Sequence, residues 1–110
     1  MTVKSTPALD LDHLAQYTLG NRDLEAELLG LFRSQAQLYL DRLGDAADDK
    51  EWRDAAHSLK GSARGLGAFA LGDIAEEAER MVDRARRAAM IERLRAAIAA
   101  VNLYIDELIG

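Results

Sequence analysis

The sequence predicts an all-α protein: an antiparallel four-helix bundle with a short additional N-terminal helix. Its composition favours helices, because the 110 residues include 20 Ala and 17 Leu, both strong helix formers, against only 11 β-branched Val, Ile and Thr residues. The single proline, Pro7, precedes the first expected helix and interrupts none of them. A chain of this length is typical of one domain. We expect that domain to span residues 1–110, with residues 1–8 as a flexible N-terminal segment.

The first two helices are each expected to begin after a capping residue. Asp10 can cap a short helix that ends near Tyr17, and Asn21 can cap a longer helix that ends near Leu43. Along the longer helix, side chains of one face recur at spacings of three and four residues. They are Leu24, Leu28, Leu31, Phe32, Gln35, Leu38, Tyr39 and Leu43.

Three more helices are expected after the acidic stretch from Asp45 to Asp49. The third runs from about Lys50 to Leu66, and its end is marked by a cluster of glycines, Gly65, Gly67 and Gly72. The fourth runs from about Leu71 to Arg87, and the fifth from about Met90 to Leu108. Four long helices joined by short connections, each with one apolar stripe, predict a bundle with the short first helix across one end.

Composition also excludes several classes of function. Without cysteine there is no disulfide, thiolate catalysis or thiolate metal site. A net charge of −5 disfavours binding to nucleic acid or to an anionic membrane. His13 and His57 have no neighbours at the spacing of a standard metal site, and no glycine-rich nucleotide loop is present. No segment is apolar enough for a signal peptide or a membrane span, so a cytoplasmic location is expected.

The third helix departs from plain bundle design at His57. At about 100° per residue, the core stripe is centred on Leu59 and comprises Trp52, Ala55, Ala56, Leu59, Ala63 and Leu66. His57 lies about 160° from Leu59, away from the core, and Gly61 follows one turn later on the same face. A glycine inside a helix costs up to about 1 kcal/mol relative to alanine. Its presence there indicates a requirement for no side chain, either for internal packing or for the approach of another protein to His57.

The charge around His57 differs from that of the whole chain. Residues 50–64 carry Lys50, Arg53, Lys60 and Arg64 against Glu51 and Asp54, a local balance of +2. A cationic surface around an exposed histidine suits a dianionic phosphoryl group.

The string AlaHisSerLeuLysGlySerAla at residues 56–63 resembles the signature of histidine-containing phosphotransfer (HPt) domains of two-component phosphorelays. The similarity extends to Gly67, Ala68, Leu71 and Glu79 and covers most of the chain. Ala78 and Ala75 depart from the family pattern, which often has Leu and Cys at these core-type positions. The resemblance implies a four-helix bundle that carries a phosphoryl group and has no autokinase activity.

The resemblance also implies roles for particular residues. His57 would accept the phosphoryl group on Nε2, Lys60 would help to neutralise it, and Glu79 could bind the other ring nitrogen. Gly61 would give a partner clearance, and Gly67 would shape the turn after the third helix. We assign Gly61, Gly67, Arg53 and Arg64 to partner docking. The expected partners are response-regulator receiver domains and a hybrid histidine kinase, and the chain is expected to be a monomer without its own metal or cofactor, the receiver supplying Mg²⁺.

Two other readings remain open at this stage. The first is a non-catalytic helical adaptor that binds a receiver or kinase without accepting phosphate. The second is the phosphoacceptor region of a histidine kinase, in which the residue after the histidine is commonly acidic; here it is Ser58, and no ATP-binding region follows. A phosphate on His57 would separate a phosphotransfer protein from an adaptor.

Overall fold

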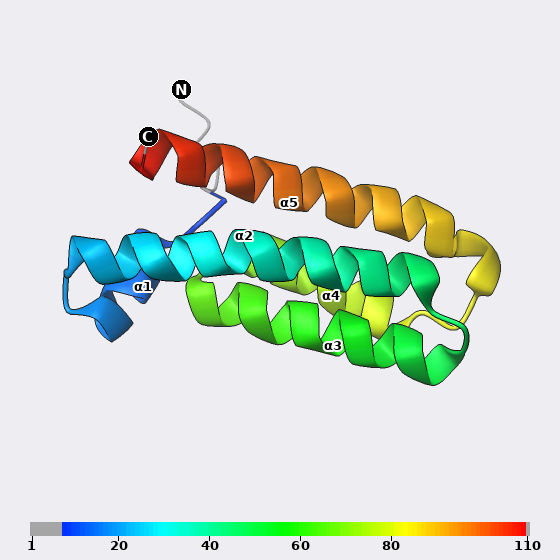
Figure 1. Cartoon of the computed structure of the whole chain (residues 1–110). Helices are drawn as coiled ribbons and strands as arrows, with labels where there is room; N and C mark the ends of the chain where they lie inside the picture. Colours follow the sequence, from blue (N-terminus) through cyan, green and yellow to red (C-terminus); the bar gives the residue numbers. More distant parts are fainter. Residues whose placement is uncertain (1–7, 110) are drawn as a thin grey trace, which may run out of the picture.

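The computed structural model describes residues 8–109, so most of the N-terminal segment expected to be flexible lies outside the described residues. Helices α2 (Arg22–Asp45), α3 (Asp49–Leu66), α4 (Phe69–Arg80) and α5 (Arg87–Ile109) run alternately up and down the bundle, as Figure 1 shows. The short helix α1 (Leu11–Thr18) contacts α2 and α3 at one end. The predicted all-α bundle with a short additional helix is therefore confirmed.

The predicted caps of the first two helices are also confirmed. The Asp10 side chain accepts a hydrogen bond from the His13 N–H at 3.1 Å, and the Asn21 side chain accepts one from the Leu24 N–H at 3.1 Å. Asp48 caps α3 in the same way through the Glu51 N–H at 2.8 Å. Each cap satisfies a backbone donor that has no partner inside its own helix, which fixes where the helix begins.

One apolar core fills the space between the helices. Every residue of the predicted core stripe of α3 is buried, from Trp52 at one end to Leu66 at the other. Leu29, Phe32 and Leu40 of α2 and Leu94, Ile98 and Ile105 of α5 pack into the same core. Within the described residues, the helices are all too polar or too short to span a membrane. Because α3 packs mainly against α4 and α2, its remaining face lies on the surface.

The expected extent of the fourth helix, Leu71 to Arg87, was wrong. Helix α4 begins at Phe69 and ends at Arg80, and a 3₁₀ turn, η1 (Arg84–Arg86), leads directly into α5. Tertiary contacts explain the break. Arg84 and Arg87 both bind Asp49 at the start of α3, at 3.1 and 2.7 Å. The chain must turn after Arg80 to bring both guanidinium groups to that carboxylate.

Gly67 makes the tight connection between α3 and α4. It has a left-handed conformation with φ +100°, which glycine adopts without steric cost. Its carbonyl accepts a hydrogen bond from the Asp10 N–H at 2.9 Å, and a Cβ at this position would lie only 2.7 Å from the Asp10 carbonyl oxygen. Gly67 thus sets the turn and also seats the segment that leads into α1.

Candidate functional site

His57 lies on the exposed face of α3, as the helical spacing predicted. Its side chain is 68% exposed, whereas Leu59 and Ala63, two and six residues later, are fully buried. The imidazole therefore projects from a helix whose opposite face is fixed in the core. A partner can reach the ring without any unfolding of the bundle.

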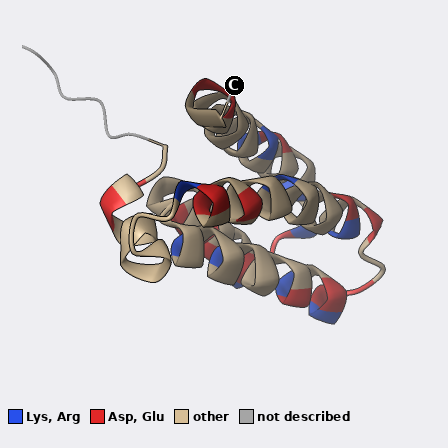
Figure 2. Cartoon of the chain, turned by 60° about the vertical axis from the view of Figure 1, so that its left-hand side comes forward, with Lys and Arg blue, Asp and Glu red and all other residues tan. Residues whose placement is uncertain are grey.

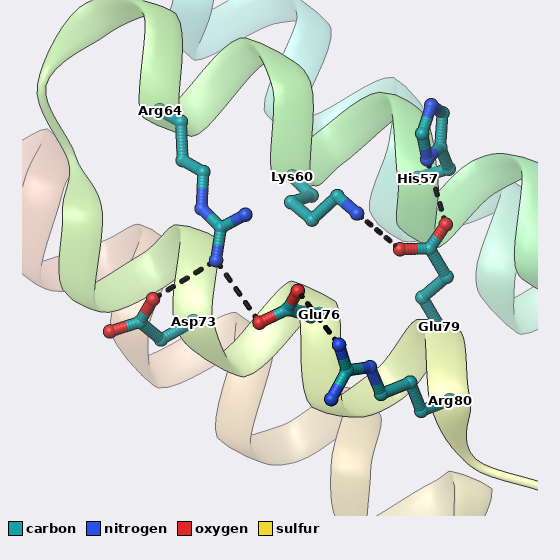
Figure 3. Close-up of polar contacts among 7 residues, drawn as sticks. All are labelled: His57, Lys60, Arg64, Asp73, Glu76, Glu79 and Arg80. Carbon is teal, nitrogen blue, oxygen red and sulfur yellow. Dashed lines mark hydrogen bonds and ion pairs between the residues drawn. The ribbon is translucent and has the colours of Figure 1, made fainter.

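Glu79 of α4 connects His57 to Lys60 (Figure 3). One carboxylate oxygen of Glu79 lies 2.7 Å from Nδ1 of His57, and the other accepts a hydrogen bond from Nζ of Lys60 at 2.5 Å. His57 and Lys60 are three residues apart on α3, so both face the same helix, α4. The structure thus brings together His57, Lys60 and Glu79, the three residues that the family resemblance assigned to the chemistry.

The Glu79 carboxylate determines which nitrogen of His57 can react. The Lys60 ammonium chiefly, and then the hydrogen bond with His57, hold the pKa of Glu79 below its usual range, against the opposing effect of partial desolvation. An ionised carboxylate accepts hydrogen bonds only, so the Nδ1 atom of His57 must be the donor. The lone pair of the neutral ring then resides on Nε2, which lies on the side of the ring away from Glu79 (Figure 3).

Gly61 opens the surface next to His57. It is exposed within α3, and a Cβ built there would have open space around it, with no heavy atom within 4 Å apart from its own stretch of helix. The gap therefore serves no packing inside the described bundle. Of the two explanations that the sequence left open for this glycine, the geometry favours the approach of another molecule.

Arg64 points to α4 rather than toward His57. Its guanidinium binds Asp73 and Glu76, each at 3.2 Å (Figure 3). Gly72 of α4 leaves room for it, because a Cβ there would lie 2.7 Å from Cγ of Arg64. Arg64 consequently joins α3 to α4 through ion pairs on the surface of the bundle.

The expected cationic surface around His57 is therefore largely neutralised. Lys50 binds Asp54 at 2.7 Å, Lys60 binds Glu79, and Arg64 binds two carboxylates of α4. Figure 2 shows basic and acidic residues interspersed along the bundle rather than gathered on separate faces. A count of charges along α3 alone misses this, because the balancing carboxylates belong to the neighbouring helix.

Two other residues assigned to docking have different positions. Arg53 is exposed on α3, one turn before His57, where a partner could contact it. Gly67 is buried under the Asp10 backbone, so the structure does not bring it to the exposed face and its place is in the turn.

Sequence reasoning gave no role to Asp73 and Glu76. Asp73, Glu76 and Glu79 are spaced three residues apart, so their carboxylates lie in one row on a single face of α4. This spacing was the signal in the sequence that could have predicted their contacts with α3.

His13 is far less accessible than His57. Its ring packs edge-on against Tyr17 and Phe69, with centroid separations of 5.4 and 5.0 Å. Residues 8–109 contain no cluster of three or more His, Asp or Glu side chains that could hold a metal ion. His57 is thus the more exposed of the two histidines.

The protein is a helical bundle with an exposed histidine, whose Nδ1 contacts a carboxylate and whose Nε2 is open. This arrangement is that of the class of phosphotransfer bundles. The family model of the Hpt domain matches residues 27–109, and the chain belongs to this family. It is also similar to the crystal structure of histidine-containing phosphotransfer protein B (HptB) from Pseudomonas aeruginosa PAO1, with 29% identity and a TM-score of 0.82. That similarity covers 94% of this chain and 95% of the HptB chain. Comparison with curated protein sequences finds no match.

The predicted resemblance to the HPt family is confirmed by these comparisons. The chain has a histidine phosphotransfer role in phosphorelays, and its family interacts there with receiver domains and kinases. Domains of this family act as phosphotransfer intermediates.

Proposed function

We propose that His57 carries the phosphoryl group on Nε2 and passes it between aspartates of receiver domains. The observation that supports this most directly is the contact of Nδ1 with Glu79, which leaves Nε2 as the nucleophile on an exposed ring. Lys60 keeps Glu79 charged and in place through its own hydrogen bond. The site needs no general base, because the proton on Nδ1 stays where it is throughout the reaction.

The transfer step balances with these residues. The Nε2 lone pair attacks the phosphorus of a receiver's aspartyl phosphate, the O–P bond breaks, and its electron pair returns to the aspartate carboxylate. The ring then carries a positive charge with Nδ1–H retained, and Glu79 lies 2.7 Å away to balance it. In the reverse step the P–N bond breaks and its electron pair returns to Nε2. Such transfer depends mainly on alignment and neutralisation of charge.

The receiver is expected to supply its own Mg²⁺, and the chain to act as an intermediate without autokinase activity. The donor is expected to be a hybrid histidine kinase. A carrier must share a compartment with these partners, for which we propose the cytoplasm. We also propose a monomer, since self-association over α3 would cover the ring that the receiver must reach.

We assign the docking of the receiver to the surface that joins α3 to the outer face of α2. Gly61 gives clearance beside the imidazole. The next residue, Ser62, lines a groove whose other lining residues, from α1, α2 and α3, are mainly apolar. On α2, Leu31 and Leu38 are 54% and 47% exposed. Because Ser62 of this groove directly follows Gly61 on α3, we expect a receiver over His57 to cover part of this apolar surface at the same time. Arg53 adds positive charge on α3, whereas the charge of Arg64 is taken up by Asp73 and Glu76 of α4.

The test is phosphoryl uptake from phosphorylated receiver domains, measured on the wild type, His57→Gln and His13→Gln. Wild type and His13→Gln should form an acid-labile phosphoprotein, and His57→Gln should form none. His57→Gln should shift the free energy of unfolding by less than about 0.5 kcal/mol, because the side chain is exposed. Uptake that persists in His57→Gln would show that another residue accepts the phosphoryl group. A wild type that binds receivers without uptake would favour the adaptor alternative.

A further inference from the structure

A phosphoryl group on His57 needs a cation that the resting site does not offer on the side of Nε2. A protein-bound phosphoryl group carries about −1.5 to −2 charges at neutral pH. Glu79 and Lys60 lie on the Nδ1 side of the ring, and Nε2 points away from both (Figure 3). The positive charge that meets the phosphoryl oxygens must therefore be sought around the outer edge of the imidazole.

Two of the nearby cations are already engaged with carboxylates. Lys60 is only 18% exposed and is bound to Glu79, so a move toward the phosphoryl group would weaken the anchor of Nδ1. Arg64 is held by Asp73 and Glu76 and lies in the space that Gly72 leaves open. A third cation, Arg42 of α2, lies over the Tyr39 ring at 5.8 Å and lines a groove with Asp54 and Ser58.

In the part of the chain that the structure describes, Arg53 differs from Lys60 and Arg64 in having no carboxylate partner, and from Arg42 in lying on the same helix as His57. It precedes His57 by four residues on α3, a spacing that puts the two Cβ atoms about 5 to 6 Å apart on one helix face. It is exposed, and within residues 8–109 it forms no ion pair. The neighbouring carboxylate, Asp54, is bound by Lys50 at 2.7 Å and does not hold the Arg53 side chain. A guanidinium can bind two phosphoryl oxygens at once in a fixed geometry.

We infer that Arg53 is the phosphoryl-binding residue of this site: it closes over the group on Nε2 of His57, while Lys60 stays with Glu79. The inference rests on the proposed function and gives two cations of α3 different roles. Lys60 orients the imidazole through Glu79, and Arg53 neutralises the phosphoryl oxygens. The arrangement lets the group arrive and leave without any disturbance of the Nδ1 contact.

The experiment loads His57 without a receiver. Phosphoramidate gives its phosphoryl group to Nε2 and releases ammonia, and the phosphoprotein is then titrated by ³¹P NMR from about pH 5.5 to about pH 9, across the usual second pKa of about 6. The variants are Arg53→Gln, Arg53→Lys, Lys60→Gln and Arg42→Gln. Arg95→Gln is the matched control, because it removes the same charge from α5 at an exposed residue whose ion-pair partner, Glu92, lies on the same helix.

Arg53→Gln should raise the phosphoryl pKa by about 0.5, a threefold change in the protonation constant, because a nearby cation favours the dianion. Arg53→Lys should keep the phosphoryl pKa closer to that of the wild type, because lysine retains the positive charge. The other variants should change this pKa less than Arg53→Gln does. A merely structural role of Arg53 would leave this titration unchanged. A larger shift in Lys60→Gln or Arg42→Gln, or no shift in Arg53→Gln, would overturn the inference.

Transfer from a receiver is measured separately on the same proteins. Its absence in a wild type that accepts phosphoramidate at His57 would overturn the proposed relay and leave the role of Arg53 standing. A wild type that takes no phosphoryl group at His57 from either donor would overturn both.

Discussion

The indole Nε1–H of Trp52 donates a hydrogen bond to the carbonyl of Ala78 at 2.7 Å, and Ala78 directly precedes Glu79. Trp52 is fully buried and begins the core stripe of α3, five residues before His57. The bond ties the last turn of α4 to α3 at the level where Glu79 must meet the imidazole. The guanidinium of Arg87 covers the indole at 4.7 Å from the ring centroid. A core residue thus sets the position of the carboxylate that anchors His57.

Trp52→Phe should therefore affect both the stability of the bundle and the His57 contact. It removes one buried hydrogen bond and some ring volume, so the free energy of unfolding should fall by about 1.5 to 3 kcal/mol. The Nδ1 proton of His57, observed by ¹⁵N-edited NMR, should exchange faster with water. Leu40→Ala is the control, since Leu40 is a buried residue of α2. It should lower stability and leave the Nδ1 signal unchanged; equal effects of both variants on that signal would contradict a specific role of Trp52.

Glu79→Gln should change how stability depends on pH. The pKa of Glu79 is lowered in the folded protein, chiefly by Lys60. The ionised group therefore stabilises the fold above its unfolded pKa, and this contribution is lost as the pH falls through the lower, folded pKa. Urea midpoints measured from about pH 7 down to about pH 3 should show wild type losing more stability than Glu79→Gln below about pH 4.5. Asp49, Asp54 and Glu77 also have lowered pKa values, but they are common to both proteins. A constant difference across the series would contradict the expectation.

Gly61 should matter for transfer and little for folding. The Cβ position is open, so Gly61→Ala should raise the free energy of unfolding by up to about 1 kcal/mol. Gly61→Glu should stay folded yet slow transfer from a receiver, because it adds bulk and negative charge beside His57. Gly30→Glu is the matched control: Gly30 is an exposed glycine of α2, also with open space around its Cβ position. Transfer rates are measured at saturating and subsaturating concentrations of the receiver. Unchanged rates in a folded Gly61→Glu protein would contradict the docking role of Gly61.

Gly67 should show the opposite behaviour. Gly67→Ala combines a left-handed backbone with a Cβ 2.7 Å from the Asp10 carbonyl oxygen, so it should cost about 2 to 4 kcal/mol of unfolding free energy. Gly20→Ala has the left-handed strain alone, with φ +78° and open space, and should cost about 1 to 2 kcal/mol. Denaturant titration of the two variants measures the difference. If the two costs are equal, the contact with Asp10 contributes nothing to the requirement for glycine.

The helix starts and the exposed face of α3 could be predicted because they depend on local chemistry. Asp10 and Asn21 cap their helices through their own side chains, and the 3.6-residue period places Leu59 in the core and His57 outside it. The end of α4 could not be predicted in the same way. Residues 81–87 include good helix formers and no Pro or Gly, and the break arises where Arg84 and Arg87 reach Asp49 on another helix.

The sequence by itself determined the bundle, the family signature and, through the helical period, the exposed face that carries His57 and Gly61. The roles expected for Lys60 and Glu79 came from the resemblance to the HPt family. Only the tertiary structure decided how the charges pair. Arg64 meets Asp73 and Glu76, and Lys60 meets Glu79, because two helices pack side by side with complementary rows. Ion pairs between helices depend on the register of packing, which no single helix encodes. That register leaves Arg53 exposed on α3, one turn before His57.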